Sequence, residues 1–264
     1  MTTVPPFFRE TGAGPGVVCL HANASSSSQW RSLMEELSPK FHVLAADSYG
    51  SGKSPPWPPG DAWLRDEVAL LEPVFERAGV PFVLVGHSYG GAIALIAALS
   101  QPSRVRALAV YEPTLFSLID ADSPPPNDAE GIKNAVRAAT AQLDAGDSRS
   151  AAEAFIDFWM GKGSWASMPE SRQEPITRSI TNIPAWSNAL LKEPTPLSAF
   201  RALTIPILYM TGSESPASSL GVARLLAPVL PNVEVIDFKG LGHMGPVTHP
   251  EPVNAAIARF LARL

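Results

Sequence analysis

The chain has 264 residues, with 20 lysines and arginines against 25 aspartates and glutamates, and therefore a formal charge of −5. Its hydrophobic share of 45% is that of an ordinary globular protein and excludes a disordered chain. A mildly acidic sequence without a basic run argues against nucleic acid or an anionic membrane as the main partner. A single cysteine permits no internal disulfide, and no cysteine–histidine cluster indicates a metal site.

The first residues show no basic region followed by an apolar one, so we expect no secretory signal and a cytoplasmic location. The segment 80–103 carries no charged side chain and is long enough to cross a bilayer. Pro81 and a run of glycines around Ser88 interrupt it, however, which favours a strand, a sharp turn and a buried helix. The sequence therefore predicts no membrane span.

Along the chain, short apolar runs of strand-forming residues alternate with helical patterns. We predict strands at 17–20, 41–46, 82–85, 105–111, 207–210 and 233–236. We predict helices between or after them at 29–37, 63–78, 91–100, 220–230 and 252–264. Runs that are apolar throughout are typical of strands buried on both faces, so the pattern indicates an α/β fold with a mostly parallel central sheet.

The alternation breaks once, because residues 113–204 contain no convincing strand. Residues 128–143 and 150–160 look helical, and a proline-rich loop at 123–126 precedes them. Ninety residues are too many for a loop and too few for a second sheet domain. We therefore predict a core formed by residues 1–112 and 205–264, with residues 113–204 inserted as a helical cap.

The turn after the predicted strand 82–85 carries a candidate catalytic residue. Residues 86–90 read Gly-His-Ser-Tyr-Gly, which matches the G-x-S-x-G nucleophile elbow. The motif requires a strand before it and a helix after it, and the sequence provides both. The competing interpretation is an incidental serine in a small-residue turn, which would need neither element. The pattern predicts that Ser88 stands above the carboxyl end of its strand, at the N-terminus of the next helix.

Four further motifs make the sequence resemble the serine-nucleophile branch of the α/β-hydrolase fold superfamily over nearly its whole length. Residues 21–25 (HANAS) resemble the His-Gly oxyanion loop, with Ala22 in the usual glycine position. Residues 47–54 (DSYGSGKS) resemble the D-x-x-G-x-G-x-S turn, and residues 240–244 (GLGHM) resemble the loop that presents the catalytic histidine. Residues 211–216 (TGSESP) fall where the family usually carries its acid.

The resemblance implies that His243 is the general base, since the family order is nucleophile, acid, histidine. It also implies that the backbone N–H groups of Asn23 and Tyr89 form the oxyanion hole. We expect structural roles for the other four histidines. His21 should brace the oxyanion loop, and His87 should lie in the elbow and point away from the base. His42 should lie on a strand surface, and His249 should cap a helix.

The acid departs from the family pattern, because Ser215 stands where G-x-x-D-P has its aspartate. A serine cannot stabilise the imidazolium with a negative charge. Some branches, certain haloalkane dehalogenases among them, carry the acid after the strand that follows the elbow helix. That strand ends here at Glu112, which we take as the acid. Glu214 in a shifted loop, Asp237, and no acid at all are the alternatives.

Specificity is expected to come from large apolar residues in the cap and at the rim. Phe116, Trp159, Trp186 and Met244 are the candidate pocket residues, with Trp165 and Met168 as further large residues of the cap. An ordinary cap core is the competing interpretation for each of them. An apolar pocket of this kind suits a small ester as the substrate.

We therefore predict a serine hydrolase of the carboxylesterase type, without a cofactor, that works through an acyl-enzyme. Serine as the nucleophile disfavours the dehalogenase and epoxide-hydrolase branches, which use aspartate. C–C bond hydrolase, lactonase, thioesterase and cofactor-free haloperoxidase activities share the same triad and stay open. A non-catalytic ligand-binding protein of the same fold is the competing class, and the serine at position 215 is its best support.

Overall fold

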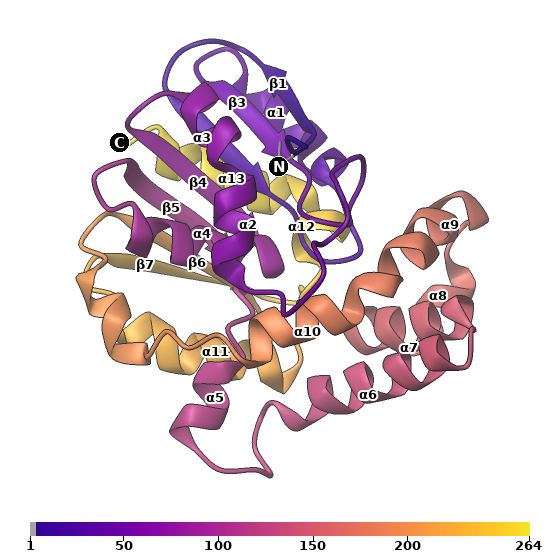
Figure 1. Cartoon of the computed structure of the whole chain (residues 1–264). Coiled ribbons are helices and arrows are strands. Elements are labelled where there is room, and N and C mark those ends of the chain that lie inside the picture. The colour runs from indigo at the N-terminus through magenta and orange to yellow at the C-terminus, as the bar shows by residue number, and fades with distance from the viewer. Residues whose placement is uncertain (1–3) are drawn as a thin grey trace.

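The computed structural model describes residues 4–264 as a seven-stranded sheet flanked by helices (Figure 1). The strand order is β1-β3-β2-β4-β5-β6-β7, and every neighbouring pair is parallel except β1 and β3. The strands are β1 (Phe8–Thr11), β2 (Gly16–Leu20), β3 (His42–Ala46), β4 (Phe82–His87), β5 (Val105–Tyr111), β6 (Ile207–Gly212) and β7 (Val233–Phe238). All six predicted strand runs form strands. The sequence analysis missed β1, a short antiparallel strand at the edge.

Burial of the strands follows their apolar runs. Every residue of β2, β4 and β6 is buried, and in β5 only Arg106 is exposed. By contrast β7, at the other edge, exposes Glu234, Val235 and Asp237. The centre of the sheet is thus buried from solvent, and the strands that carry the predicted catalytic residues lie there.

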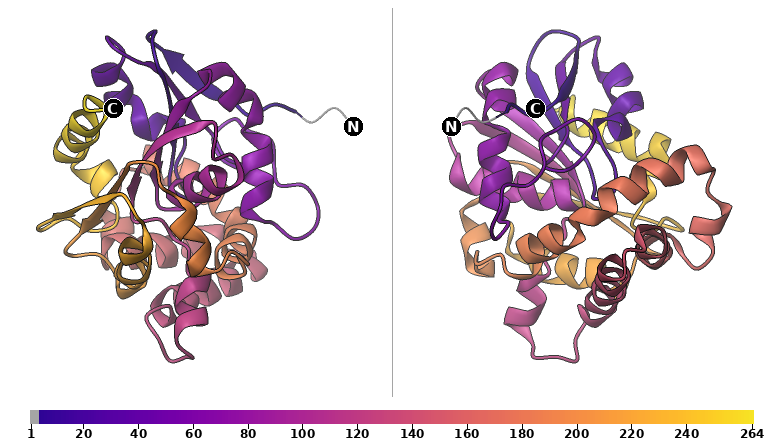
Figure 2. Two further views of the ribbon diagram at one scale, coloured as in Figure 1. Left: turned by 90° about the vertical axis from the view of Figure 1, so that its left-hand side faces the viewer. Right: turned by 45° about the vertical axis from the view of Figure 1, so that its right-hand side comes forward.

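Helices cover both faces of the sheet (Figure 2). One face is covered by α1 (Arg31–Leu37) and α13 (Pro250–Leu261), whose apolar sides share one core with the strands. The other face is covered by α2 (Leu64–Leu70), α3 (Glu72–Ala78), α4 (Tyr89–Ser100) and α11 (Ala217–Leu226). Shorter elements complete the core: η1 (Ser27–Trp30), η3 (Leu197–Ala202), η4 (Ala227–Val229) and α12 (Gly245–Thr248).

The predicted helix 63–78 is wrong as a single helix. The structure ends α2 at Leu70 and begins α3 at Glu72, with Pro73 in the first turn of α3. A proline has no N–H to donate to the preceding turn and its ring crowds that turn, so the chain ends one helix and starts another. Proline is tolerated at the start of the second helix because N–H groups there have no partner within the helix.

A helical insertion lies between β5 and β6. It contains α5 (Ser117–Asp122), α6 (Glu130–Asp144), α7 (Ser148–Met160), α8 (Ser164–Ser167), α9 (Glu170–Ser179), η2 (Ile180–Asn182) and α10 (Ile183–Leu191). Figure 1 shows α6 to α10 gathered at one end of the sheet. Between β5 and β6 the described chain forms no strand, as expected, although the sequence analysis did not foresee α5, α8, α9 and α10. Among residues 4–264, no helix combines the length and apolar character needed to cross a membrane.

The single cysteine lies inside this sheet. Cys19 is in β2, with none of its surface exposed. Burial raises the pKa of its thiol, because a thiolate would lose its hydration there. The thiol is therefore a core side chain without the properties of a reactive one.

Candidate active site

Ser88 occupies the sharp turn between β4 and α4. Its backbone dihedrals are φ 55° and ψ −115°, a conformation that a residue with a side chain rarely adopts. The N–H of Ser88 donates to the carbonyl of Tyr111 over 2.9 Å, which ties the turn to β5. Strained residues of this kind cluster at functional sites, where the surrounding structure maintains them. The strand–turn–helix context predicted for the motif is present.

The glycines of the elbow provide the space for this turn. A Cβ atom on Gly90 would lie 2.3 Å from the carbonyl oxygen of Leu20, and one on Gly86 would lie 2.5 Å from that of Gly90. Both contacts are with backbone atoms, which cannot rotate away as a side chain does. The motif therefore needs glycine at these two positions for steric reasons.

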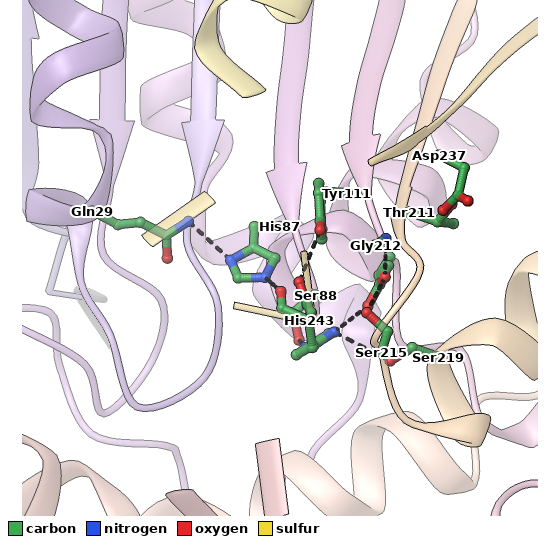
Figure 3. A network of polar contacts seen from close by, with 12 residues as sticks. Gln29, His87, Ser88, Tyr111, Thr211, Gly212, Ser215, Ser219, Asp237 and His243 are labelled. Carbon is green, nitrogen blue, oxygen red and sulfur yellow. Dashed lines mark hydrogen bonds and ion pairs between the residues drawn. The ribbon is translucent and has the colours of Figure 1, made fainter. Parts of the chain in front are cut away.

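His243 links the serine to a carboxylate. Its Nε2 lies 2.9 Å from Oγ of Ser88, and its Nδ1 lies 2.7 Å from Oε2 of Glu112. All three side chains are buried, with exposed fractions of 4% for Ser88, 1% for His243 and none for Glu112. Figure 3 shows Ser88 and His243 facing each other where β4 and β5 end. The structure thus brings together the three residues predicted as nucleophile, base and acid.

Glu112 is held by its backbone and by both carboxylate oxygens. It follows β5 with a positive φ of 44°, and its N–H donates to the carbonyl of Met210 over 3.0 Å. Its Oε1 accepts hydrogen bonds from the N–H of Gly212 at 2.7 Å and from the hydroxyl of Ser215 at 2.6 Å. Oε2 is left for His243. A buried carboxylate with this many donors is held in one position beside the imidazole.

The two alternative acids lie elsewhere. Glu214 is exposed, and Asp237 is exposed and accepts a hydrogen bond from Oγ1 of Thr211 at 3.1 Å. Figure 3 shows the Thr211–Asp237 pair apart from His243. Among residues 4–264, Glu112 is the only carboxylate bonded to the His243 ring.

Two serines near His243 escaped the sequence analysis as partners of the site. Ser219, in the first turn of α11, has its Oγ 3.1 Å from Nδ1 of His243. Ser215 bonds to Glu112, as described above. The signal for Ser215 was its place in the family's acid position. Nothing in the sequence marks Ser219, because its contact depends on how α11 packs against the loop.

The main chain around His243 is anchored by side chains of the core. Nε2 of His87 lies 2.8 Å from the carbonyl of His243, and Nδ1 of His87 lies 3.1 Å from Nε2 of Gln29. Burial lowers the pKa of His87 well below its usual value, and the His243 ring adds to this effect. The hydroxyl of Tyr111 donates to the carbonyl of Gly242 over 2.8 Å. The expectation that His87 points away from the base is therefore wrong, because its ring faces the loop that carries His243 and supports it.

The loop after β2 lines the same cavity as the serine. Nδ1 of His21 lies 2.7 Å from the carbonyl of Ala22, and its Nε2 accepts from the N–H of Ser48 over 3.1 Å, so His21 braces this loop. The N–H of Ala22 donates to Oε1 of Gln29 over 3.1 Å and is therefore occupied. The next residue, Asn23, lines a cavity together with Ser88.

Tyr89 is the first residue of α4. The N–H groups in the first turn of a helix have no partner within that helix. The Tyr89 N–H is thus available, at the end of α4 where the helix dipole favours negative charge.

A cavity of about 110 Å³ opens above Ser88 and extends into the cap. Its wall includes all four predicted pocket residues, Phe116, Trp159, Trp186 and Met244, together with Met168. Trp165 does not line the cavity and is buried in the cap core. The Trp159 ring stacks on the His243 ring with centroids 4.0 Å apart and planes inclined by 27°. The cap thus covers one face of the imidazole.

The site is built from the side chains of the protein. Among the described residues, no three or more His, Cys, Asp or Glu side chains are grouped so that they could hold a metal ion. What the arrangement offers chemically is a hydroxyl, an imidazole and a carboxylate in series beside an apolar cavity.

Comparisons with known proteins agree with this fold. Residues 15–250 match the family model described as alpha/beta hydrolase fold. A pimeloyl-[acyl-carrier protein] methyl ester esterase of Xanthomonas campestris pv. campestris is 30% identical over 264 residues, covering 96% of this chain and 97% of that protein. An esterase of the same description from Nitrosomonas europaea is 26% identical over 245 residues, covering 91% and 93% of the two chains.

Solved structures agree as well. A thermophilic esterase from Thermogutta terrifontis, solved with malate bound, superposes with a TM-score of 0.75 and 26% identity, covering 98% of this chain and 93% of that one. The family match spans most of the sequence, and it includes the elbow, Glu112 and His243. This chain belongs to the alpha/beta hydrolase fold family.

Proposed function

We propose that the protein is a serine carboxylesterase that cleaves a small carboxylic ester through an acyl-enzyme. The observation that carries this proposal is the hydrogen-bonded series from Ser88 Oγ through His243 to Glu112, with distances of 2.9 and 2.7 Å. The similarity to esterases of comparable length supports the choice of an ester over other acyl compounds.

In the first half of the reaction, the hydroxyl of Ser88 attacks the ester carbonyl while Nε2 of His243 accepts its proton. The imidazolium then protonates the departing alcohol, and the acyl group stays on Oγ of Ser88. In the second half, His243 accepts a proton from water while the water oxygen attacks the acyl carbon. The bond from that carbon to Oγ of Ser88 then breaks, His243 returns the proton to Oγ, and the carboxylic acid leaves. Throughout, Glu112 orients the Nδ1–H of His243 and stabilises the positive charge on the ring.

Both halves pass through a tetrahedral intermediate whose oxygen carries negative charge. We assign its stabilisation to the backbone N–H groups of Asn23 and Tyr89. Ala22 is unsuited to this role, since its N–H is bonded to Gln29. The N-terminus of α4 adds a favourable dipole at the same point.

Hydrolysis of p-nitrophenyl acetate and butyrate by the wild type and by Ser88→Ala tests the proposal. We expect turnover by the wild type and none above background by the variant, which lacks the nucleophile. Labelling by a fluorophosphonate probe, with Ser88→Ala as the unlabelled control, detects an activated serine even when the ester chosen is a poor substrate. A folded wild type that neither hydrolyses the esters nor takes the label would favour the non-catalytic binding protein instead.

A further inference from the structure

The wall of the active-site cavity is mostly apolar, with a few neutral polar side chains and one permanently charged one. Apart from His243, Arg172 is the only charged or titratable side chain that lines the cavity within residues 4–264, and no carboxylate of those residues lines it. Arg172 lies in the first turn of α9, close to Met168, which also lines the cavity. The cavity therefore has the reactive groups in one part of its wall and a cation in another part, in the cap.

Arg172 differs from Arg137, Arg149 and Arg178 of the cap, each of which has a side-chain partner. Arg149 donates to Oε1 of Gln173 over 2.7 Å, and Arg178 pairs with Glu174 over 2.8 Å. Arg137 donates to the side chain of Asn134. Arg172 is exposed, and it forms no side-chain hydrogen bond or ion pair with any other residue of the described chain 4–264.

The acidic residues nearest to Arg172 in sequence do not neutralise it. Glu170 and Glu174 lie two positions before and after it on α9, and residues two apart on a helix point in different directions. Glu174 is moreover engaged with Arg178. The guanidinium thus has no acceptor within the protein and its donors face solvent, so they are open to a ligand, and a planar guanidinium matches a carboxylate in a two-pronged arrangement.

We propose that Arg172 binds a carboxylate at the far end of the substrate, so that the enzyme prefers an ester with an aliphatic arm ending in that charge, such as a monoester of a dicarboxylic acid. This inference rests on the proposed esterase function and specifies its substrate class. The apolar wall between Ser88 and Arg172 accommodates methylene groups, and the cation binds the end of the chain. A matching arm length is required, because the charge pairs only when the ester carbonyl also lies at Ser88.

The test compares two matched series of methyl esters, one with a terminal carboxylate (monomethyl succinate to monomethyl suberate) and one without it (methyl butanoate to methyl octanoate). The rate of hydrolysis is measured from the acid released. The quantity compared is the ratio of kcat/KM between the two esters of equal length. For the wild type, we expect this ratio to peak at one length, about two- to fivefold above its value in Arg172→Gln, which is the range for an exposed ion pair. Arg172→Lys should keep part of the preference.

Arg178→Gln is the matched control, since it removes a charge from the same helix outside the cavity wall. Its ratio should equal that of the wild type. A parallel series of acetate esters of ω-hydroxy acids places the carboxylate on the alcohol arm and shows which arm occupies the cavity. A ratio that Arg172→Gln leaves unchanged in both series would overturn the proposal.

Failure of the esterase function itself is recognised separately. If the wild type hydrolyses no ester of either series, binding of monomethyl adipate to Ser88→Ala is measured by calorimetry, with and without Arg172→Gln. Weaker binding in the double variant supports the carboxylate site without any turnover, and equal binding refutes it.

Discussion

Ser215 donates its hydroxyl proton to Oε1 of Glu112 over 2.6 Å. The residue in the family's usual acid position thus supports a carboxylate from a neighbouring strand. Gly212 adds a backbone donor to the same oxygen, so the second oxygen of Glu112 is free to accept from His243. A carboxyl group beside the imidazole is retained, although it comes from the end of β5 and not from the loop after β6.

This arrangement predicts the result of neutralising Glu112. Glu112→Gln keeps the shape of the side chain but removes its charge, and its amide can present an N–H toward Nδ1 of His243. We expect kcat to fall by about four orders of magnitude, as in other triads that lose their acid. Glu214→Gln is the control, since Glu214 is exposed and its change should leave kcat within about twofold. Loss of activity in the control alone would show that Glu214 is the acid.

A second prediction concerns transfer of the acid to the family position. Ser215→Asp alone places two carboxylates side by side in a buried site, which should lower stability and activity because like charges repel there. Combined with Glu112→Gln, the same aspartate becomes the only charge. We expect the double variant to recover at least about tenfold in kcat over Glu112→Gln. Steady-state kinetics on p-nitrophenyl butyrate measures this, and a double variant no faster than Glu112→Gln would contradict it.

The close packing of the elbow predicts that a methyl group added at Gly90 destabilises the fold. Gly90→Ala would place a Cβ atom 2.3 Å from the Leu20 carbonyl oxygen, so β2 and α4 must move apart. We expect a loss of about 3 kcal/mol or more in the free energy of unfolding. Gly242→Ala, in the His243 loop, meets its nearest atom at 3.6 Å and is the mild counterpart. Urea unfolding followed by circular dichroism compares the two variants, and equal stabilities would argue against the steric role.

Stability should also depend on pH through Glu67. This side chain on α2 is buried, and burial raises its pKa to about 8 against an ordinary value of 4.5. The N–H of Tyr49 and the hydroxyl of Tyr89 bond to its oxygens, at 3.2 and 3.1 Å, and offset only part of that effect. Between pH 4.5 and 8 the folded protein therefore keeps a proton that the unfolded chain has released.

By linkage, the contribution of Glu67 to stability is largest below pH 4.5 and is lost as the pH rises toward 8. Glu67→Gln has no such proton. We expect its free energy of unfolding, relative to the wild type, to increase by roughly 2 to 4 kcal/mol between pH 5 and pH 8.5. Urea titrations at both pH values give the difference, and a constant offset between the two proteins would show that Glu67 is ionised in the fold.

Much of the fold follows from the sequence because apolar runs and glycines act locally. The six main strands and the strained turn at Ser88 could be predicted for that reason. The short strand β1 could not, since it is half-buried and is fixed by pairing with β3. The break between α2 and α3 was signalled by Pro73 and overlooked.

For the site, the limit of the sequence lies in contacts between distant segments. Glu112 was predictable because a parallel sheet brings the carboxyl ends of its strands to one edge. The contact of Gln29 with His87, and the stacking of Trp159 on His243, join segments far apart in the chain. No local pattern encodes such pairs, since they depend on how loops and cap helices pack.

Because Cys19 is buried, the reactivity of its thiol reports on unfolding of the chain. A thiol-specific reagent reaches this side chain only when β2 leaves the sheet, and β2 lies between β3 and β4 in the centre of the fold. The rate of labelling of the single cysteine therefore measures opening of the core, with no introduced probe. Under native conditions it separates ligands that stabilise the whole fold from ligands that act only on the cap.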